Sequence, residues 1–227
     1  MSLDNGAWLC SVYSMQSARS YAVERVREWV LDGTLTDGSR INEGAIAKAL
    51  AISRTPLREA LFDLSADGYI ESIERRGFFV RPLSLVEFEG LYDIRPILDP
   101  QALRLGGIPD PRTIDKLVDL DERLAKATTP TEIVDADDAF HLTLISGCPN
   151  SVLIDLIEQM MRRTRRFEMA LFREVEQLPR AKREHERLID HLRARDLNGA
   201  LAALVDNLSS GKAPIRHWLI QRIGKQK

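Results

Sequence analysis

The sequence predicts a mostly α-helical protein in two parts: a three-helix module closed by a β-hairpin, followed by an all-α bundle of six or seven helices. Three observations predict this class. Alanine and leucine are abundant, whereas aromatic residues make up only 6% of the 227 residues. The segment YIESIERRGFFV (69–80) places apolar residues on both sides of a charged turn, as a β-hairpin does. Every periodic segment from Leu85 onward has helical spacing.

The first module is predicted to span residues 17–82. An N-terminal arm (1–16) precedes it, which could be frayed or could form a short helix against a neighbour. Asp-Gly pairs end the first and third helices, and Asn42 is positioned to cap the second. The three helices are expected at 17–31, 43–50 and 54–66.

The second part is predicted to span residues 83–227 and to contain helices only. Prolines fall at or near most of the breaks between its periodic segments, and Ser84 can cap the first helix. The expected helices lie at 85–105, 111–126, 130–146, 150–176, 180–195, 197–210 and 214–224.

Bulk charge and cysteine content narrow the possible functions. The formal net charge of −2 gives no general attraction to polyanions, so any nucleic-acid surface must depend on where individual arginines lie. Cys10 and Cys148 are far apart in the sequence, which favours a reducing compartment over a disulfide framework. No apolar run reaches the roughly 18 residues of a membrane span, and the start lacks a signal-peptide pattern. We therefore expect a cytoplasmic protein with no membrane partner.

The stretch SRTPLREAL (53–61) combines a leucine stripe with two arginines on the predicted third helix. The leucines lie at helical spacing and are expected to pack on the first two helices. Arg54 and Arg58 are four residues apart, to one side of that stripe. Ser53 or Thr55 is expected to cap the helix, and backbone N–H groups at its start attract phosphate.

Such a helix can enter the DNA major groove with its N-terminal end, where arginine forms two hydrogen bonds to guanine. The alternative is that the arginines are ordinary surface charges paired with Glu59 or Asp63. The order of elements favours DNA: a short helix and a tight link precede the arginine helix, and a hairpin follows it. Arg75 and Arg76 stand beside Gly77 at that hairpin's tip. Together the elements describe a winged helix-turn-helix.

Residues 21–82 resemble the DNA-binding domain of the GntR family of bacterial transcriptional regulators, most specifically in SRTPLREAL and RRGFFV. The helical remainder is similar to the FCD ligand-binding domain of the FadR-like branch. The resemblance implies base contacts from Arg54 and Arg58, phosphate contacts from Ser53 and Thr55, and a wing tip formed by Gly77 and its neighbours. Many relatives carry a further DNA-contacting arginine where this chain has Gly44; Arg40 or Lys48 could compensate.

The segment DDAFH (137–141) places a carboxylate and an imidazole on one helical face. The FCD resemblance implies a divalent metal, zinc or nickel, held by one aspartate and three histidines. The matching positions are Asp137, His141, His185 and Asn207. Asparagine is a poor ligand for these metals compared with histidine. Two possibilities stay open: a metal completed by water or an effector carboxylate, or a polar site that binds the effector by hydrogen bonds alone. His191 should point elsewhere, because it lies about 240° round the helix from His185.

Arg95, in LYDIRPILD, is a further effector-binding candidate by the same resemblance, with Asp99 in place of the glutamate of relatives. Held by Asp99, the guanidinium can offer a fork to an organic carboxylate; the alternative is an ion pair that serves structure only. The arginines of the basic run 162–166 are expected mainly on a solvated or interdomain face, and the alternative is that some of them face the cavity.

These observations predict a ligand-responsive transcriptional regulator rather than an enzyme. The resemblance implies a homodimer formed through the helical domain, an inverted-repeat operator, a small organic-acid effector, and repression as the commoner mode. One rival is a metal-dependent hydrolase using Asp137, His141 and His185, although no nucleophile–base pair or glycine-rich phosphate loop stands out. Another is a constitutive DNA binder without a working effector site.

Overall fold

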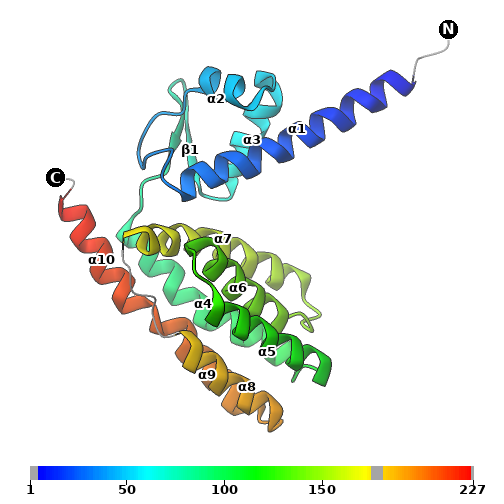
Figure 1. The fold of residues 1–227 in the computed structure, drawn as a ribbon, viewed down its shortest axis with the longest axis vertical. Helices are drawn as coiled ribbons and strands as arrows, with labels where there is room; N and C mark the ends of the chain where they lie inside the picture. Colours follow the sequence, from blue (N-terminus) through cyan, green and yellow to red (C-terminus); the bar gives the residue numbers. More distant parts are fainter. Residues whose placement is uncertain (1–4, 175–180, 226–227) are drawn as a thin grey trace. The chain divides into compact units, whose positions relative to one another are not determined.

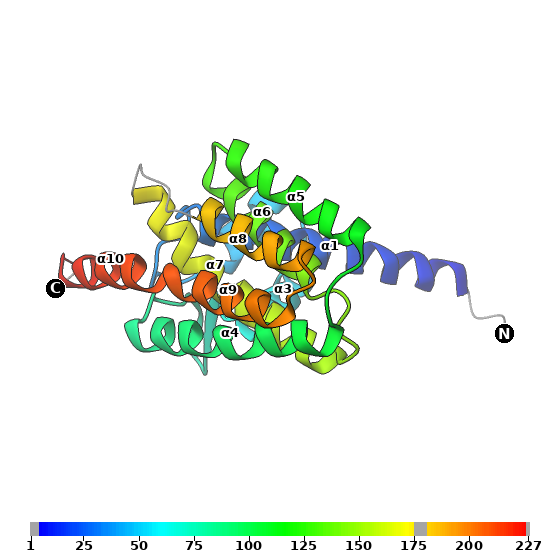
Figure 2. The same ribbon diagram turned by 90° about the horizontal axis from the view of Figure 1, so that it is seen from below.

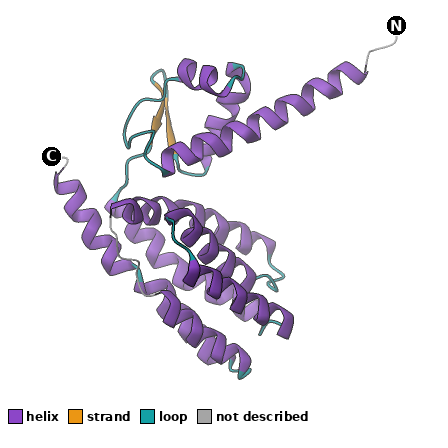
Figure 3. Ribbon diagram, viewed as in Figure 1, coloured by secondary structure: helices purple, strands orange, loops and turns teal. Residues whose placement is uncertain are grey.

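The computed structural model describes residues 5–174 and 181–225, and the chain divides into two compact units, Met1–Pro82 and Leu83–Lys227 (Figure 1). Each unit is described by itself below. The first contains the strands of the described chain, and the second is helical throughout its described residues (Figure 3). The prediction of a mostly α-helical protein is therefore confirmed.

The first unit contains three helices and a two-stranded antiparallel hairpin, in the predicted order. The helix α1 begins at Asn5, so the expected start of the first helix at residue 17 is wrong: residues 5–16 are helical and continue into it, and residues 1–4 lie outside the described part. No glycine or proline falls between residues 7 and 31, so nothing in the sequence stops the helix early. The elements are α1 (Asn5–Leu31), α2 (Glu43–Leu50), α3 (Arg54–Ala66), β1 (Ile70–Ile73) and β2 (Gly77–Val80).

The core of the first unit forms where α3 packs on α1 and α2. Leu57, Leu61 and Leu64 are completely buried, as their helical spacing predicted. The hairpin pairs Ile70 with Val80. The link between α1 and α2 also joins this sheet, because Arg40 forms a bridge to Phe79. The wing is therefore tied to the body of the unit by more than its own turn.

The second unit contains seven helices among its described residues, and six of them form a closed ring. Following their contacts, α4 packs on α7, α7 on α6, α6 on α5, α5 on α8, α8 on α9, and α9 again on α4 (Figure 2). The helix α10 packs mainly on α4. The bounds are α4 (Leu85–Gly106), α5 (Pro111–Lys126), α6 (Pro130–Leu144), α7 (Ser151–Glu174), α8 (Ala181–Arg193), α9 (Leu197–Ser210) and α10 (Lys212–Lys225).

Local signals explain where these helices begin. Ser84, Asp110, Thr129 and Asp196 each accept a hydrogen bond from a backbone N–H in the first turn of the helix that follows. Thr129 and Glu132 form a complete capping box. Predicted and observed starts for α4 to α9 therefore differ by no more than a residue.

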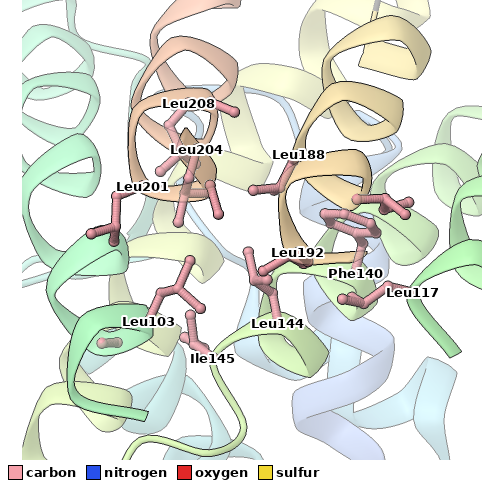
Figure 4. Packing of buried hydrophobic residues seen from close by; sticks show 14 of the residues in the cluster. Leu103, Leu117, Phe140, Leu144, Ile145, Leu188, Leu192, Leu201, Leu204 and Leu208 are labelled. Carbon is pink, nitrogen blue, oxygen red and sulfur yellow. The ribbon is translucent and has the colours of Figure 1, made fainter. Parts of the chain in front are cut away.

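Leucine side chains from all six ring helices contribute to its apolar core, and Figure 4 shows many of them. Polar side chains are buried in the same unit: Asp99 and His185 have no exposed surface, and His141 retains 3%. Burying such groups costs free energy unless they are paired, which directs attention to their partners.

Candidate DNA-reading surface and effector site

The N-terminal end of α3 is exposed and is not capped by a side chain. Ser53 occupies the N-cap position with extended backbone angles, but its side chain makes no capping hydrogen bond, and Thr55 lies inside the first turn. The predicted N-cap position of Ser53 is therefore confirmed, but the expected capping hydrogen bond from its side chain is not formed. Both side chains and that of Arg54 are exposed. This end of the helix keeps the properties of an anion-binding site.

Arg54 and Arg58 lie where α3 meets the start of α2. The Arg58 side chain is 55% exposed, and its Nε lies 3.7 Å from Glu43 Oε2. Arg54 Nη2 would lie 3.7 Å from a Cβ built on Gly44, the residue at which relatives were expected to carry another arginine. The predicted alternative partner Asp63 instead binds Arg19. Both guanidinium groups are thus near α2 and loosely held.

The wing tip is formed by the turn between β1 and β2. Arg75 and Arg76 are exposed, and Arg75 adopts a left-handed backbone conformation with φ of 61°. Gly77 has φ of 93°, which a residue with a Cβ rarely adopts. Arg40 Nη2 would lie 3.9 Å from a Cβ at Gly77, so a third arginine stands beside the tip.

In the second unit, the structure brings together Asp137, His141 and His185. One potential ligand atom from each lies within 4.8 Å of the others. His141 Nε2 is 3.7 Å from Asp137 Oδ2, and His185 Nε2 is 3.5 Å from Asp137 Oδ1. Two imidazole nitrogens therefore flank one carboxylate, with α6 supplying two of the residues and α8 the third.

The chemistry of this donor set fits a divalent transition metal. Burial, with the nearby charges of Arg95 and His185, holds the pKa of His141 well below its usual value, so its imidazole is neutral at physiological pH. Neutral imidazole is the form that binds metal. His141 Nδ1 and His185 Nε2 are buried without a hydrogen-bond partner among the described residues. Two nitrogens and one carboxylate suit zinc or nickel and leave coordination positions open.

Asn207 lies on α9 and is 8% exposed. Its Nδ2 is directed to Glu184 Oε2 at 3.5 Å, next to His185 in the sequence. His191, the second histidine on α8, points away from the cluster as expected. Its Nδ1 lies 2.9 Å from Asp196 Oδ2.

Arg95 is buried and bonded to Asp99, at the spacing that the sequence indicated. Its Nη2 donates to Asp99 Oδ2 at 2.9 Å. Burial raises the pKa of Asp99, and the guanidinium opposes that rise. Arg95 Nε and Asp99 Oδ1 have no hydrogen-bond partner within the described ranges. The pair therefore keeps unused hydrogen-bonding capacity.

Sequence reasoning missed several groups near this pair. Tyr92 donates its hydroxyl to Glu168 Oε1 at 3.1 Å. Burial raises the pKa of Glu168 to about 7, and the charges of Asp138 and Asp137 add to that rise. Burial also raises the pKa of Asp138 to about 6, with Asp137 adding to it and Arg165 opposing it. Asp138 stands within DDAFH and could have been found there, whereas nothing local marks Glu168.

The basic run on α7 is largely paired or buried, so the solvated face among the predicted alternatives is wrong. Arg163 pairs with Glu87, Arg165 pairs with Asp135 and Asp138, and Arg166 is 3% exposed. Successive residues on a helix are turned by about 100°, so four neighbouring arginines cannot share one face.

No helix in the described residues is long and apolar enough to cross a bilayer. A winged module with arginines at its exposed helix end, joined to a helical unit with a buried polar cluster, has the construction of a DNA-binding regulator with a sensor domain.

Comparison with known proteins agrees with this class of DNA-binding regulator. Residues 19–80 match bacterial regulatory proteins of the gntR family, and residues 90–210 match the FCD domain. The chain belongs to the GntR family of transcriptional regulators and carries an FCD domain.

Individual relatives support this assignment over nearly the whole chain. The HTH-type transcriptional regulator YdhC of Bacillus subtilis is 25% identical over 202 residues, covering 86% of this chain and 89% of the relative. The gluconate operon transcriptional repressor of Bacillus licheniformis is 25% identical over 212 residues, covering 87% and 85%. The structure of E. coli McbR/YncC has the same fold, with a TM-score of 0.75, 21% identity, and coverage of 89% and 98%. The two Bacillus proteins are named as transcriptional regulators, and the hydrolase alternative has no support in either name.

Proposed function

We propose that this protein is a cytoplasmic, homodimeric repressor that releases an inverted-repeat operator when a small organic acid binds its helical unit. The observation that carries the proposal is the uncapped, exposed start of α3 with Arg54 and Arg58 beside it. A repressor named for the gluconate operon among the relatives supports both the mode of regulation and an acidic effector.

On DNA, α3 would enter the major groove with its N-terminal end. Arg54 and Arg58 would each offer two parallel hydrogen bonds to a guanine, worth about 1–3 kcal/mol of discrimination per pair. Ser53, Thr55 and the uncapped backbone N–H groups would bind phosphates. The wing would add contacts from Arg75 and Arg76, with Gly77 allowing the backbone to come close.

In the helical unit, the effector would bind at the polar cluster. Asp137, His141 and His185 would hold a divalent metal, which supplies a positive docking point for a carboxylate. Arg95 would offer its remaining donors to a second oxygen of the acid. Asn207 would contribute an amide in place of a fourth metal ligand.

The outer face of α4 supports a dimer formed through this unit. Val86, Ile94, Ile97 and Leu105 are exposed there, Val86 by 81% and Ile97 by 67%. Their spacing is symmetric about the middle of the helix. An antiparallel copy of α4 would therefore set Val86 opposite Leu105 and Ile94 opposite Ile97, as an isologous two-fold interface requires.

Coupling requires only that the effector binds one arrangement of the dimer more tightly than another. A ligand that favours a spacing of the two winged units unsuited to the operator would release the DNA.

The test is operator binding by Arg58→Ala, with Arg25→Ala as a control that removes the same charge from α1. An operator selected from random duplex would be titrated by fluorescence anisotropy at fixed salt. We expect Arg58→Ala to weaken specific binding by roughly 10-fold or more, and Arg25→Ala by much less. Equal affinities for wild type and Arg58→Ala would overturn the assignment of α3 as the base-reading helix.

A further inference from the structure

A carboxylate that belongs to none of the motifs described above lies against the metal-ligand cluster. Asp121 is on α5, which otherwise buries Ile114, Leu117, Leu120 and Leu124. It is 6% exposed, and its Oδ1 lies 3.2 Å from His185 Nδ1. A carboxylate buried among leucines destabilises the fold unless a partner compensates it, and His185 is that partner.

His185 is held from a second direction by an aromatic ring. The rings of Phe140 and His185 are stacked, with centroids 3.9 Å apart and an interplanar angle of 9°. Both residues have no exposed surface. Asp121 thus fixes one edge of the imidazole while Phe140 fixes its face, and the ring cannot turn without breaking one of these contacts.

The position of Asp121 selects one tautomer of His185. A carboxylate at Nδ1 favours the proton on that nitrogen, which leaves the lone pair on Nε2. Nε2 is the nitrogen that faces Asp137 Oδ1, at 3.5 Å. A hydrogen-bonded carboxylate also makes the imidazole a stronger donor to a metal.

We infer that Asp121 is a positioning residue of the effector site: through Nδ1 it orients His185 and directs the Nε2 lone pair toward a metal held with Asp137 and His141. This inference rests on the metal site of the proposed function. In a cluster where Asn207 stands in place of a histidine, a better-oriented His185 offsets part of the missing ligand's contribution.

The competing explanation is that Asp121 and His185 form a buried pair that only stabilises the fold. Zinc affinity separates the two roles. Asp121→Asn keeps the volume and an acceptor oxygen but removes the charge. Asp119→Asn makes the same change at an exposed position on the same helix. Metal-free full-length proteins would be titrated with zinc against a chromophoric chelator at fixed pH.

We expect Asp121→Asn to bind zinc about 10–100-fold more weakly than wild type, and Asp119→Asn to bind it equally well. A structural role would lower the melting temperature of the zinc-free protein while leaving zinc affinity unchanged. That result would overturn the inference.

A second measurement needs no variant and no metal. The nitrogen-15 chemical shifts of the His185 ring in the zinc-free wild type at pH 8 should show a protonated Nδ1 and an unprotonated Nε2. A proton on Nε2 instead would contradict the role of Asp121. Wild type that binds no zinc would refute the metal part of the proposed function, whereas the ring shifts would still decide what Asp121 does.

Discussion

The two units hold their functional charges in opposite ways. In the winged unit, Arg58 is more than half exposed, and its nearest carboxylate oxygen is 3.7 Å away. In the helical unit, Arg95 is buried and donates to Asp99 at 2.9 Å. An exposed guanidinium keeps its donors available for a large, strongly charged partner. A buried one is already oriented, which lowers the entropy lost when a small ligand binds.

This difference predicts different consequences of substitution. Exposed side chains in the winged unit should affect partner binding with little effect on stability. Buried groups in the helical unit should affect both, because each is part of a compensated network. The following variants test that contrast, from the largest expected effect to the smallest.

Asp99→Ala should produce the largest loss of stability, because it leaves the buried Arg95 charge without its bonded carboxylate. We expect the free energy of unfolding to fall by about 3–5 kcal/mol in urea titrations followed by circular dichroism. Asp93→Ala is the control, because Asp93 lies on the same helix as Asp99. It removes an exposed ion pair with Lys212 of α10 and should cost about 0–1 kcal/mol. Similar losses in the two variants would remove the distinction between buried and exposed pairs.

His185→Ala should reduce zinc affinity further than Asp121→Asn does, because it removes a direct metal ligand. Loss of a residue that only hydrogen-bonds to a ligand typically costs roughly 10–100-fold. His191→Ala lies on the same helix but faces Asp196, and should leave zinc binding unchanged. Both can be measured by chelator competition and by metal content after dialysis. Equal metal content in His185→Ala and wild type would show that the cluster is not the binding site.

Gly77→Ala tests whether the wing depends on its backbone conformation. The glycine has φ of 93°, and forcing a left-handed conformation on alanine costs about 1–2 kcal/mol. The winged unit should melt at a lower temperature in calorimetry. Gly44→Ala should be neutral or slightly stabilising, because that glycine is helical and an added Cβ meets only ordinary contacts. A destabilised Gly44→Ala with an unaffected Gly77→Ala would reverse the expected order.

Glu168→Gln should have the smallest effect, visible as a pH dependence. The folded-state pKa of Glu168 is raised to about 7, above the ordinary value near 4.5, so the folded state binds this proton more tightly than the unfolded state. Wild-type stability should therefore fall as pH rises from about 4.5 to 7, and glutamine should remove this contribution to the fall. Melting temperatures of both proteins at pH 5 and pH 8 measure it; parallel shifts would show that Glu168 titrates normally.

Local spacing determined which features could be predicted from the sequence. Leucines at positions 57, 61 and 64 predicted the buried face of α3, and DDAFH predicted that Asp137 and His141 share a face. The start of α1 at Asn5 was not predicted, because no helix-breaking residue near position 17 separates residues 7–16 from the helix that follows.

Contacts between distant helices could not be predicted in this way. Asp121 meets His185 across 64 positions of sequence, and Tyr92 meets Glu168 across 76. Such pairs depend on how the ring of helices closes, which has no periodic signature in a single sequence.

Neighbouring residues on α4 face in clearly different directions, about 100° apart. Arg95 points into the unit with 7% exposure, while Ile94 is 41% exposed on the outer side. A helix moves as a nearly rigid rod. An acid that binds the Arg95 guanidinium and shifts α4 would therefore displace the outer isoleucines by the same amount. In the proposed dimer, α4 would thus contribute both to effector binding and to the contact between subunits. A signal would cross from one to the other through the thickness of one helix, without a relay of intermediate side chains.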